Sequence, residues 1–342
     1  MTLVGKFFTV FLLTSFLLCS CNHEKVSDNN YFTIKGYAQG TTYSITYQDS
    51  LKRNFASSID SILKRIDLEL STYDSSSFIS ELNNSKDTCL NLSGKDLFLF
   101  CFRYSKKIHD KTSGSFNPAV YPLVNYWGFY NNSNPKIDSL YITDSLLNYT
   151  NLHKSFEIDS VNDQLFLCKN NIYSKLDFNG VAQGYSVDVI TDYFDISAIE
   201  NYFVEVGGEI SVNGLNPNNN LWKIGIDQPI ENSSPGENEF QKIIELNNQS
   251  LATSGSYRKF KIINGQKVSH SINPTTGFPA NNNLLSVTVI CDQAASADAL
   301  ATSFMVMGKE KAIDYIIKNR KDSIMCYMVY DSINKTREWS NF

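Results

Sequence analysis

The segment QAASADALATSFMVMG, residues 293–308, places an acid and a hydroxyl within an otherwise apolar run. Asp298 and Thr302 are spaced so that a helix would put both side chains on one face. A carboxylate and a hydroxyl on one face can bind a hard cation such as Mg²⁺. Alternatively, the acid stabilises the helix N-terminus and the hydroxyl bonds a carbonyl of its own helix.

Four further segments combine glycine or small polar residues with an expected strand or helix end. They are LDFNGVAQGYSVD at 176–188, VEVGGEISVNG at 204–214, LATSGSYRKF at 251–260 and SHSINPTTGFP at 269–279. Glycine allows backbone to approach a ligand closely, and His270 could act as a base or serve a structural purpose. None matches a P-loop or GxGxxG, so the standard phosphate-binding loops are absent. The sequence also offers no evident phosphate-binding lysine.

The bulk composition is that of a large folded protein. The chain has 342 residues, of which 42% are hydrophobic and 19% charged, enough for one large domain or two fused lobes. The net charge is −5 and the lysines are scattered. Nucleic acid is therefore excluded as a partner, because a phosphate backbone requires a basic face.

The N-terminus is typical of a targeting segment. Lys6 precedes the apolar run FFTVFLLTSFLL at 7–18, which is too short to span a bilayer. The ending LCSC at 18–21 resembles a bacterial lipoprotein signal with Cys21 as the lipidated residue; an ordinary secretory signal is the alternative. We expect a signal peptide at 1–20, a tether at 21–30 and a body at 31–342, anchored to a membrane and facing the periplasm.

Five cysteines follow the signal: Cys89, Cys101, Cys168, Cys291 and Cys326. No pair has CxxC spacing, and an odd number cannot all form intramolecular disulfides. Zinc binding by these cysteines is not expected. Buried free thiols, with at most a fortuitous disulfide, are the prediction.

Hydrophobic periodicity predicts both strands and helices. We expect a hairpin turning at Gln39-Gly40, helices at 55–70 and from a cap at Ser93 to Lys111, and a surface insertion at 130–150. Beyond these we expect a hairpin turning at Asn162-Asp163, a helix at 181–194, strands at 202–206, 222–226 and within 241–291, helices near 296–319 and a last strand at IMCYMVY. Without strict βαβ alternation, α+β is the predicted class.

Nine segments, taken in order over residues 33–310, resemble the ApbE family of flavin transferases, which use FAD to attach FMN to a Thr or Ser of a target protein. The segments are GYAQGTTYSI, LSTYDSSSFISELN, TSGSFNPAVYPLVNYWGF, LDFNGVAQGYSVD, VEVGGEI, WKIGIDQP, ATSGSY, HSINPTTGFP and SVTVICDQAASADALATSFMVMG. The resemblance implies an α+β, T-fold-like body whose two lobes share a flavin cleft.

The resemblance also assigns roles to individual residues. Mg²⁺ would be bound by Asp298, Thr302 and the carbonyl of Gly180, and His270 would be the base. Tyr73 would pack on the isoalloxazine, and the flavin nucleotide would be lined by Gln39, Ser115, Phe116, Asn117, Asp177, Gln183 and Ile272. Three of these depart from the family pattern: Gln39 replaces the Met of many members, Asn117 the usual Asp, and Gln183 a Lys or Glu.

The expected activity is Mg²⁺-dependent transfer of FMN from FAD to a protein hydroxyl, with release of AMP. Two alternatives stay open from the sequence. One is a Mg²⁺-dependent FAD pyrophosphatase that yields FMN and AMP, and the other is a lipoprotein that binds FAD without any reaction.

Overall fold

The computed structural model describes residues 30–131, 136–231, 236–237, 239–257, 260–263, 265–333 and 335–342. The predicted signal peptide, Cys21 and all but the last residue of the tether lie outside these ranges. Within them, the helices are too short or too polar to cross a lipid bilayer.

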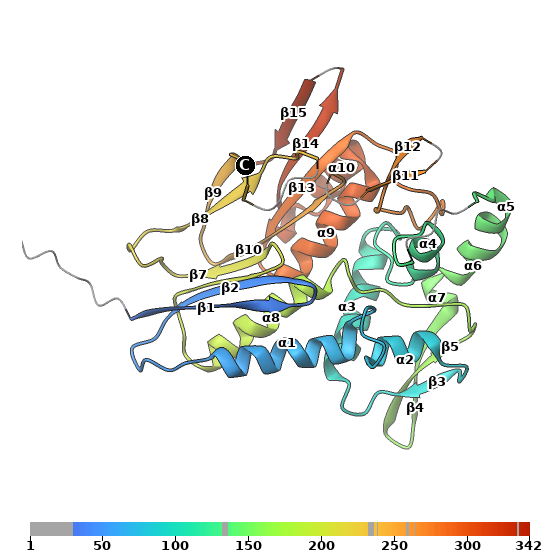
Figure 1. Ribbon diagram of the computed structural model, residues 1–342, viewed down its shortest axis with the longest axis horizontal. Coiled ribbons are helices and arrows are strands. Elements are labelled where there is room, and N and C mark those ends of the chain that lie inside the picture. The colour runs from blue at the N-terminus through green and yellow to red at the C-terminus, as the bar shows by residue number, and fades with distance from the viewer. Residues whose placement is uncertain are drawn as a thin grey trace, which may run out of the picture.

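An antiparallel sheet of eight strands forms the centre of the larger lobe (Figure 1). Its order is β1-β2-β6-β7-β10-β13-β14-β15, so the N-terminal hairpin lies beside strands from the middle of the chain. The strands are β1 (Tyr31–Ala38), β2 (Thr41–Gln48), β6 (Tyr202–Val206), β7 (Glu209–Asn213), β10 (Gln249–Gly255), β13 (Leu284–Cys291), β14 (Met325–Ser332) and β15 (Lys335–Ser340).

Both faces of this sheet are covered. Helices α8 (Ala182–Ile196) and α9 (Ala294–Met307) pack on one face, with α1 (Ala56–Leu70) against α8 and α10 (Lys309–Lys318) against α9. The hairpin β8 (Trp222–Asp227) and β9 (Phe240–Leu246) packs on the other face. Strand β13 is buried on both faces and is correspondingly apolar along most of its length, with Ser286 and Thr288 as buried polar exceptions.

Helices α8 and α9 approach each other closely at Gly184. A Cβ at this position would lie 2.4 Å from the carbonyl oxygen of Ala294, so only glycine fits. The first half of α9 is rich in alanine and almost wholly buried. This close packing fixes α9, and with it Asp298 and Thr302, against the start of α8.

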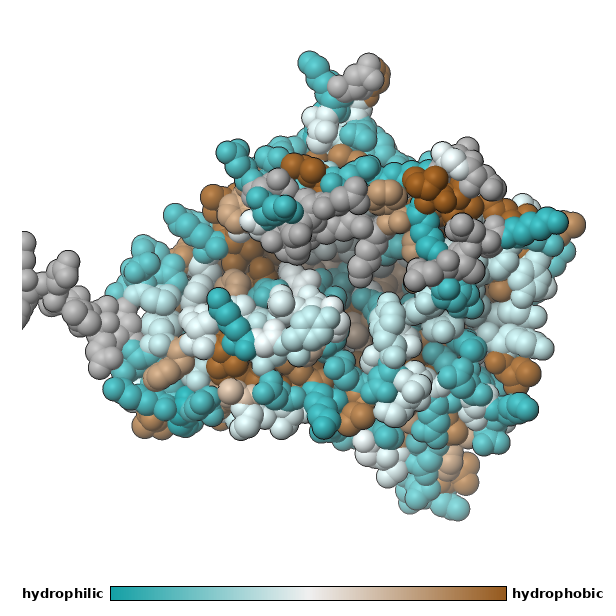
Figure 2. All heavy atoms as spheres, viewed as in Figure 1, coloured by the Kyte–Doolittle hydropathy of each residue, from teal (hydrophilic) through white to brown (hydrophobic). Residues whose placement is uncertain are grey.

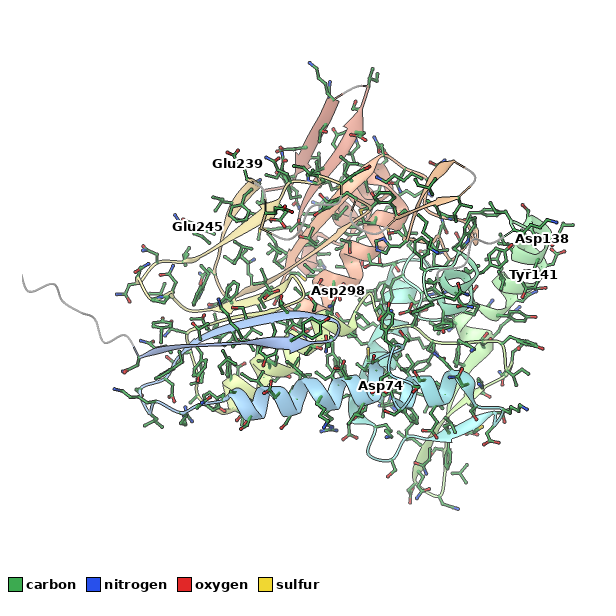
Figure 3. The ribbon with its side chains drawn as sticks, in the orientation of Figure 1. Asp74, Asp138, Tyr141, Glu239, Glu245 and Asp298 are labelled. Carbon is green, nitrogen blue, oxygen red and sulfur yellow. A yellow bond between two sulfur atoms is a disulfide. The ribbon has the colours of Figure 1, made fainter. Side chains whose placement is uncertain are left out.

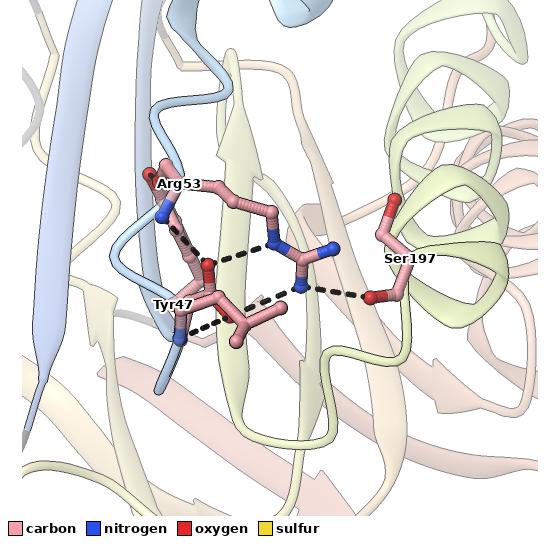
Figure 4. Close-up of polar contacts among 5 residues, drawn as sticks. Tyr47, Arg53 and Ser197 are labelled. Atoms are coloured by element: carbon pink, nitrogen blue, oxygen red, sulfur yellow. Dashed lines mark hydrogen bonds and ion pairs between the residues drawn. The ribbon is translucent and has the colours of Figure 1, made fainter.

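The N-terminal hairpin is also held from its open end (Figure 4). The guanidinium of Arg53 forms hydrogen bonds with the carboxylate of Asp49 at 2.9 and 3.0 Å and with the carbonyl of Ser197 at 2.9 Å. The hydroxyl of Tyr47 donates to the carbonyl of Arg53. These bonds join the end of β2 to the end of α8. They therefore fix the open end of the hairpin relative to α8.

The smaller lobe contains α2 (Phe78–Asn84), α3 (Asp96–Lys111) and a sheet of β3 (Cys89–Asn91), β5 (Gln164–Lys169) and β4 (Phe156–Val161). Cys89 and Cys168 face each other across β3 and β5 and form a disulfide. The cross-strand register brings these two sulfurs together, and the prediction of free thiols with at most a fortuitous disulfide allowed one such pair. It is confirmed for Cys101, Cys291 and Cys326, which are free and buried.

The remaining short elements connect those already described. They are α4 (Tyr121–Tyr126), α5 (Ser139–Tyr141), a π-helical turn (Ile142–Leu146), α6 (Leu147–Tyr149), α7 (Leu152–Ser155), β11 (Phe260–Ile263), β12 (Gln266–Ser269) and a 3₁₀ turn (Arg320–Asp322). Ile142 and Leu146 are buried against Trp127 and Ile272. The predicted surface insertion is thus wrong for this part of 130–150, because its apolar residues complete a small core.

Most predicted boundaries agree with the structure, but the start of one helix differs and several elements, among them α2, β3 and α4, were not predicted. Helix α3 begins at Asp96 rather than after a cap at Ser93, because residues 93–94 form a turn in which the Ser93 amide donates to Asn91. Strand β15 was not expected, since its sequence KTREWS is mostly exposed and lacks an apolar alternation. The hairpin turns at Gln39-Gly40 and Asn162-Asp163 are confirmed.

Candidate functional site: a cleft between the lobes

A cleft of about 700 Å³ opens where the two lobes and the connecting elements meet. Figure 2 shows this face of the molecule hollowed near its centre, beside the tip of the β1–β2 hairpin. The cleft has the size of a site for a large organic ligand. Eleven of the residues predicted for the site line it: Tyr73, Ser115, Phe116, Asn117, Asp177, Gly180, Gln183, His270, Ile272, Asp298 and Thr302.

The three predicted cation ligands come together at one end of the cleft. Asp298 and Thr302 project from α9, and a Cβ built on Gly180 would lie 3.3 Å from the Thr302 hydroxyl oxygen. Figure 3 places Asp298 near the middle of the molecule, close to the hairpin tip. A carboxylate, a hydroxyl and an adjacent backbone segment are oxygen donors, as Mg²⁺ requires. Ser254 of β10 adds a second hydroxyl, 3.2 Å from that of Thr302.

The electrostatics of this end of the cleft favour a bound cation. Burial raises the pKa of Asp298 above the usual range of a carboxyl group, and the negative charge of Asp188 adds to the rise. Burial also raises the pKa of Asp188 to about 7, although its carboxylate accepts hydrogen bonds from the amides of Ala294 and Ala295. Burial and mutual repulsion make the ionised forms of these two neighbouring acids unfavourable. A bound cation would stabilise both ionised forms. The residues present therefore fit Mg²⁺.

The loop of Ser115, Phe116 and Asn117 forms another wall of the cleft. The amide of Phe116 donates to the hydroxyl of Thr112 at the end of α3. The side chain of Asn117 donates to the carbonyl of Thr150 at 2.9 Å and accepts from the amide of Ala119 at 2.9 Å. Asn117 thus shapes the loop, using both ends of its side-chain amide on backbone groups.

Asp177 is buried beside this loop and is held by two donors. The hydroxyl of Tyr130 donates to one carboxylate oxygen at 2.6 Å, and the amide of Asn179 donates to the other at 2.7 Å. Burial raises the pKa of Asp177, and both hydrogen bonds oppose that rise. The carboxylate is therefore fixed in orientation and faces the cleft as a hydrogen-bond acceptor.

Aromatic side chains form the rim above Asp177. Tyr130 is stacked on Tyr121 with ring centroids 4.5 Å apart, and its centroid lies 5.6 Å from that of Tyr73. The side chain of Tyr73 is 74% exposed in spite of its size. An exposed tyrosine at the edge of a cleft is suited to pack on a flat ligand.

His270 lies at the end of β12, as its sequence context predicted, and lines the cleft. Its ring is 6.4 Å from that of Phe129, and it is partly buried. Ile272 follows as a buried residue paired with Pro279 across an isolated bridge. The side chain of Gln183 packs against Gly207, whose positive φ of 67° and lack of a Cβ make that contact possible.

Gln39 does not line the cleft, so the structure does not support its predicted role. It occupies the hairpin turn with a φ of 54°, and its amide contacts the hydroxyl of Ser186 on α8. The hairpin reaches the cleft instead through Thr41 and Thr42. The first two residues of β2 therefore line the site, and the turn residue before them does not.

Several polar residues that line the cleft were missed by the sequence analysis, among them Tyr130 and Lys261. Tyr130 directly follows the family-like segment ending in Phe129, and only the aromatic run YWGFY at 126–130 could have indicated it. Lys261 also lines the cleft, where its ammonium donates to the carbonyl of Gly128 at 2.7 Å. The sequence analysis did not anticipate a lysine in the cleft lining.

The comparisons with known proteins agree with this geometry. Residues 39–328 match the ApbE family. The chain belongs to the ApbE family. It is 33% identical over 331 residues to the FAD:protein FMN transferase of Vibrio cholerae, with 95% of each chain covered, and 29% identical over 340 residues to that of Salmonella typhimurium, covering 96% of this chain and 94% of that one.

Solved structures of ApbE proteins have the same fold. The flavin transferase ApbE from Vibrio cholerae superposes with a TM-score of 0.75 at 31% identity, covering 91% of this chain and 96% of that one. The flavinyl transferase ApbE of Pseudomonas stutzeri gives a TM-score of 0.77 at 27% identity, covering 91% of this chain and 94% of that one. The predicted α+β, ApbE-like architecture is confirmed.

Proposed function

We propose that this protein transfers FMN from FAD to a Thr or Ser hydroxyl of a target protein, with Mg²⁺ and with release of AMP. The observation that carries the proposal is the meeting of three oxygen donors, a fixed carboxylate and a histidine in one cleft of about 700 Å³. Family membership and the names of the relatives, FAD:protein FMN transferases, support the same reaction class.

The residues divide between binding and reaction. Tyr73 would pack on the isoalloxazine, the loop of Ser115 to Asn117 and the carboxylate of Asp177 would hold the flavin nucleotide, and Ile272 and Gln183 would complete the walls. Because Asp177 is already oriented by Tyr130 and Asn179, it is ready to accept a hydrogen bond from the ligand. Little rearrangement is then needed on binding.

The chemical step is an in-line displacement at the phosphorus on the FMN side of FAD. The acceptor oxygen forms the new P–O bond, the bond from that phosphorus to the bridging oxygen breaks, and AMP leaves with that oxygen. A neutral hydroxyl is a poor nucleophile, so His270 takes its proton. The lining of the cleft orients the phosphorus toward the acceptor, which supplies much of the rate in phosphoryl transfer.

Mg²⁺ would be held by Asp298, Thr302 and the carbonyl of Gly180, and when bound it offsets negative charge on the diphosphate oxygens. Asp298 contributes the formal charge of this set. Its replacement by Asn keeps the shape of the side chain and removes that charge. Asp292, exposed and outside the cleft lining, provides a matched control for the same change.

The test follows AMP by chromatography and protein-bound flavin by fluorescence after denaturation. The full-length protein is mixed with FAD and with either Mg²⁺ or EDTA. The mixture also contains an unmodified recombinant acceptor protein, chosen because the Vibrio cholerae relative uses it as a substrate. We expect AMP and bound flavin only when Mg²⁺ and acceptor are both present, and their loss in Asp298→Asn and His270→Gln but not in Asp292→Asn. AMP with free FMN and no need for acceptor would replace the proposal by an FAD pyrophosphatase, and intact FAD throughout would leave a flavin-binding lipoprotein.

We also propose that Cys21 carries a lipid that anchors the body to a membrane, facing the periplasm. The signal-like sequence at 1–20 and the Cys89–Cys168 disulfide support this location, because disulfides persist in oxidising compartments. Cells grown with a labelled fatty acid should incorporate label into the wild type and not into Cys21→Ser. Equal labelling of both proteins would overturn the proposed anchor.

A further inference from the structure

A cluster of two histidines and an acid lies outside the residues that line the cleft. His109 and Asp110 are in the last turn of α3, and His153 is in α7. One ligand atom from each of the three residues lies within 4.8 Å of the others. This arrangement joins helices separated by more than forty residues of sequence, so local spacing could not reveal it.

We propose that His109, Asp110 and His153 bind a divalent transition-metal ion, with Zn²⁺ as the expected species. Histidine nitrogen and carboxylate oxygen are typical zinc ligands, and three protein ligands leave one tetrahedral position for water. Imidazole ligands disfavour Mg²⁺ and Ca²⁺, which take oxygen. The site is thus distinct in chemistry from the all-oxygen set of Asp298, Thr302 and Gly180.

The hydrogen bonding of His109 prepares it for this role. Its Nδ1 lies 2.9 Å from the carbonyl of Phe116, and a carbonyl can only accept, so Nδ1 carries the proton. The lone pair is then on Nε2, which is left as the metal ligand. A ligating histidine that donates its other N–H to a backbone carbonyl is the usual arrangement around protein-bound zinc.

His153 and Asp110 supply the other two donors from the exposed side. The Nε2 of His153 lies 2.7 Å from a carboxylate oxygen of Asp110, and both side chains are about half exposed. A simple surface ion pair would account for these two residues but would contribute little to stability. The ring of His109 lies beside this pair, with its centroid 5.4 Å from that of His153, and its Nε2 takes no part in the bond to Phe116. An ion between the three side chains uses all of them and remains open to solvent.

The cluster is also joined to the loop that lines the cleft. The Nδ1 of His109 donates a hydrogen bond to the carbonyl of Phe116. The side-chain amide of Asn117 donates to the carbonyl of Thr150, just before α7. The elements that carry the proposed ligands therefore meet at the back of one loop. A metal there would link α3 to α7 without contacting the reacting groups.

The experiment measures zinc bound to the full-length protein after gel filtration in buffer with excess Mg²⁺, using elemental analysis. We expect about one zinc per chain in the wild type and in Asp298→Asn, whose cleft has lost its charged ligand. His153→Ala and His109→Ala should lose the bound zinc during gel filtration, because one of three protein ligands is missing. Zinc should also raise the melting temperature of the wild type but not of His153→Ala.

Two controls keep the outcome decisive. Because His153 is exposed, His153→Ala and the wild type should have the same melting temperature in EDTA. This comparison distinguishes the loss of zinc from a loss of folded structure. Co²⁺ in place of zinc should give visible absorption bands of a tetrahedral site in the wild type and in His270→Ala, but not in His153→Ala. Equal zinc in wild type and His153→Ala, or zinc absent from the wild type, would overturn the proposal.

Discussion

The disulfide between Cys89 and Cys168 should determine a large share of the stability of the protein. We consider its removal in the double variant Cys89→Ser/Cys168→Ser. The two cysteines are 79 residues apart in sequence, so the bond closes a long loop in the unfolded chain. The loop-entropy relation gives about 4.5 kcal/mol of stabilisation for a loop of this length.

The expected shift in melting temperature follows from the size of the body. A folded body of roughly 310 residues has an unfolding entropy of about 0.65 kcal/mol/K, so a loss of ~4.5 kcal/mol lowers the melting temperature by about 7 °C. Calorimetry of the wild type and the double variant, each with and without a reducing agent, measures this shift. The reducing agent should lower the melting temperature of the wild type and leave that of the double variant unchanged.

The same variant separates stability from function. Neither cysteine lines the cleft, so FAD binding by the double variant at low temperature should match that of the wild type. Two results would refute the reasoning. One is a melting temperature within about 1 °C of the wild type, and the other is alkylation of Cys89 and Cys168 as free thiols in the native, unreduced protein.

Three further predictions concern the cleft and its supports. Tyr130→Phe removes the donor 2.6 Å from Asp177, so affinity for FAD, measured by quenching of flavin fluorescence, should fall about tenfold; an unchanged affinity would contradict the orienting role of this hydroxyl. Gly184→Ala forces a Cβ against the backbone of α9 and should cost about 1–3 kcal/mol in urea unfolding, whereas a neutral result would mean that the helices can separate freely. In EDTA, the free energy of unfolding should fall as pH rises from about 4 to 7, because the raised pKa values of Asp188 and Asp298 make the native state hold protons that the unfolded chain has lost. Urea titrations at pH 5 and 8 measure this, and equal stability at both would exclude it.

The features that the sequence predicted well are local. Asp298 and Thr302 are one helical turn apart, so their common face follows from the helix alone. The turn at Gln39-Gly40 and the helix of α1 likewise follow from patterns of a few residues. The family resemblance added the order of the segments, and the structure then brought eleven of the twelve predicted cleft residues to one place.

The features that were missed depend on contacts between distant segments. Cys89 meets Cys168 only through the register of β3 and β5, and Lys261 reaches the cleft only because β11 folds back over the connection after α4. Gln39 was assigned to the cleft because of its position in the sequence. Its sequence position is next to the site, but the backbone turn directs its side chain to Ser186. Side-chain direction at a turn with positive φ is not given by spacing.

The position of the N-terminal hairpin in the large sheet has a consequence for how the protein is made. Thr41 of β2 and Thr302 of α9 are far apart in the sequence, yet both line one cleft. A chain that is still emerging from the ribosome has no complete cleft until α9 has appeared. Contacts this far apart in sequence form late, because they carry the largest loop-closure entropy. Flavin binding therefore reports a chain that has folded at least through α9.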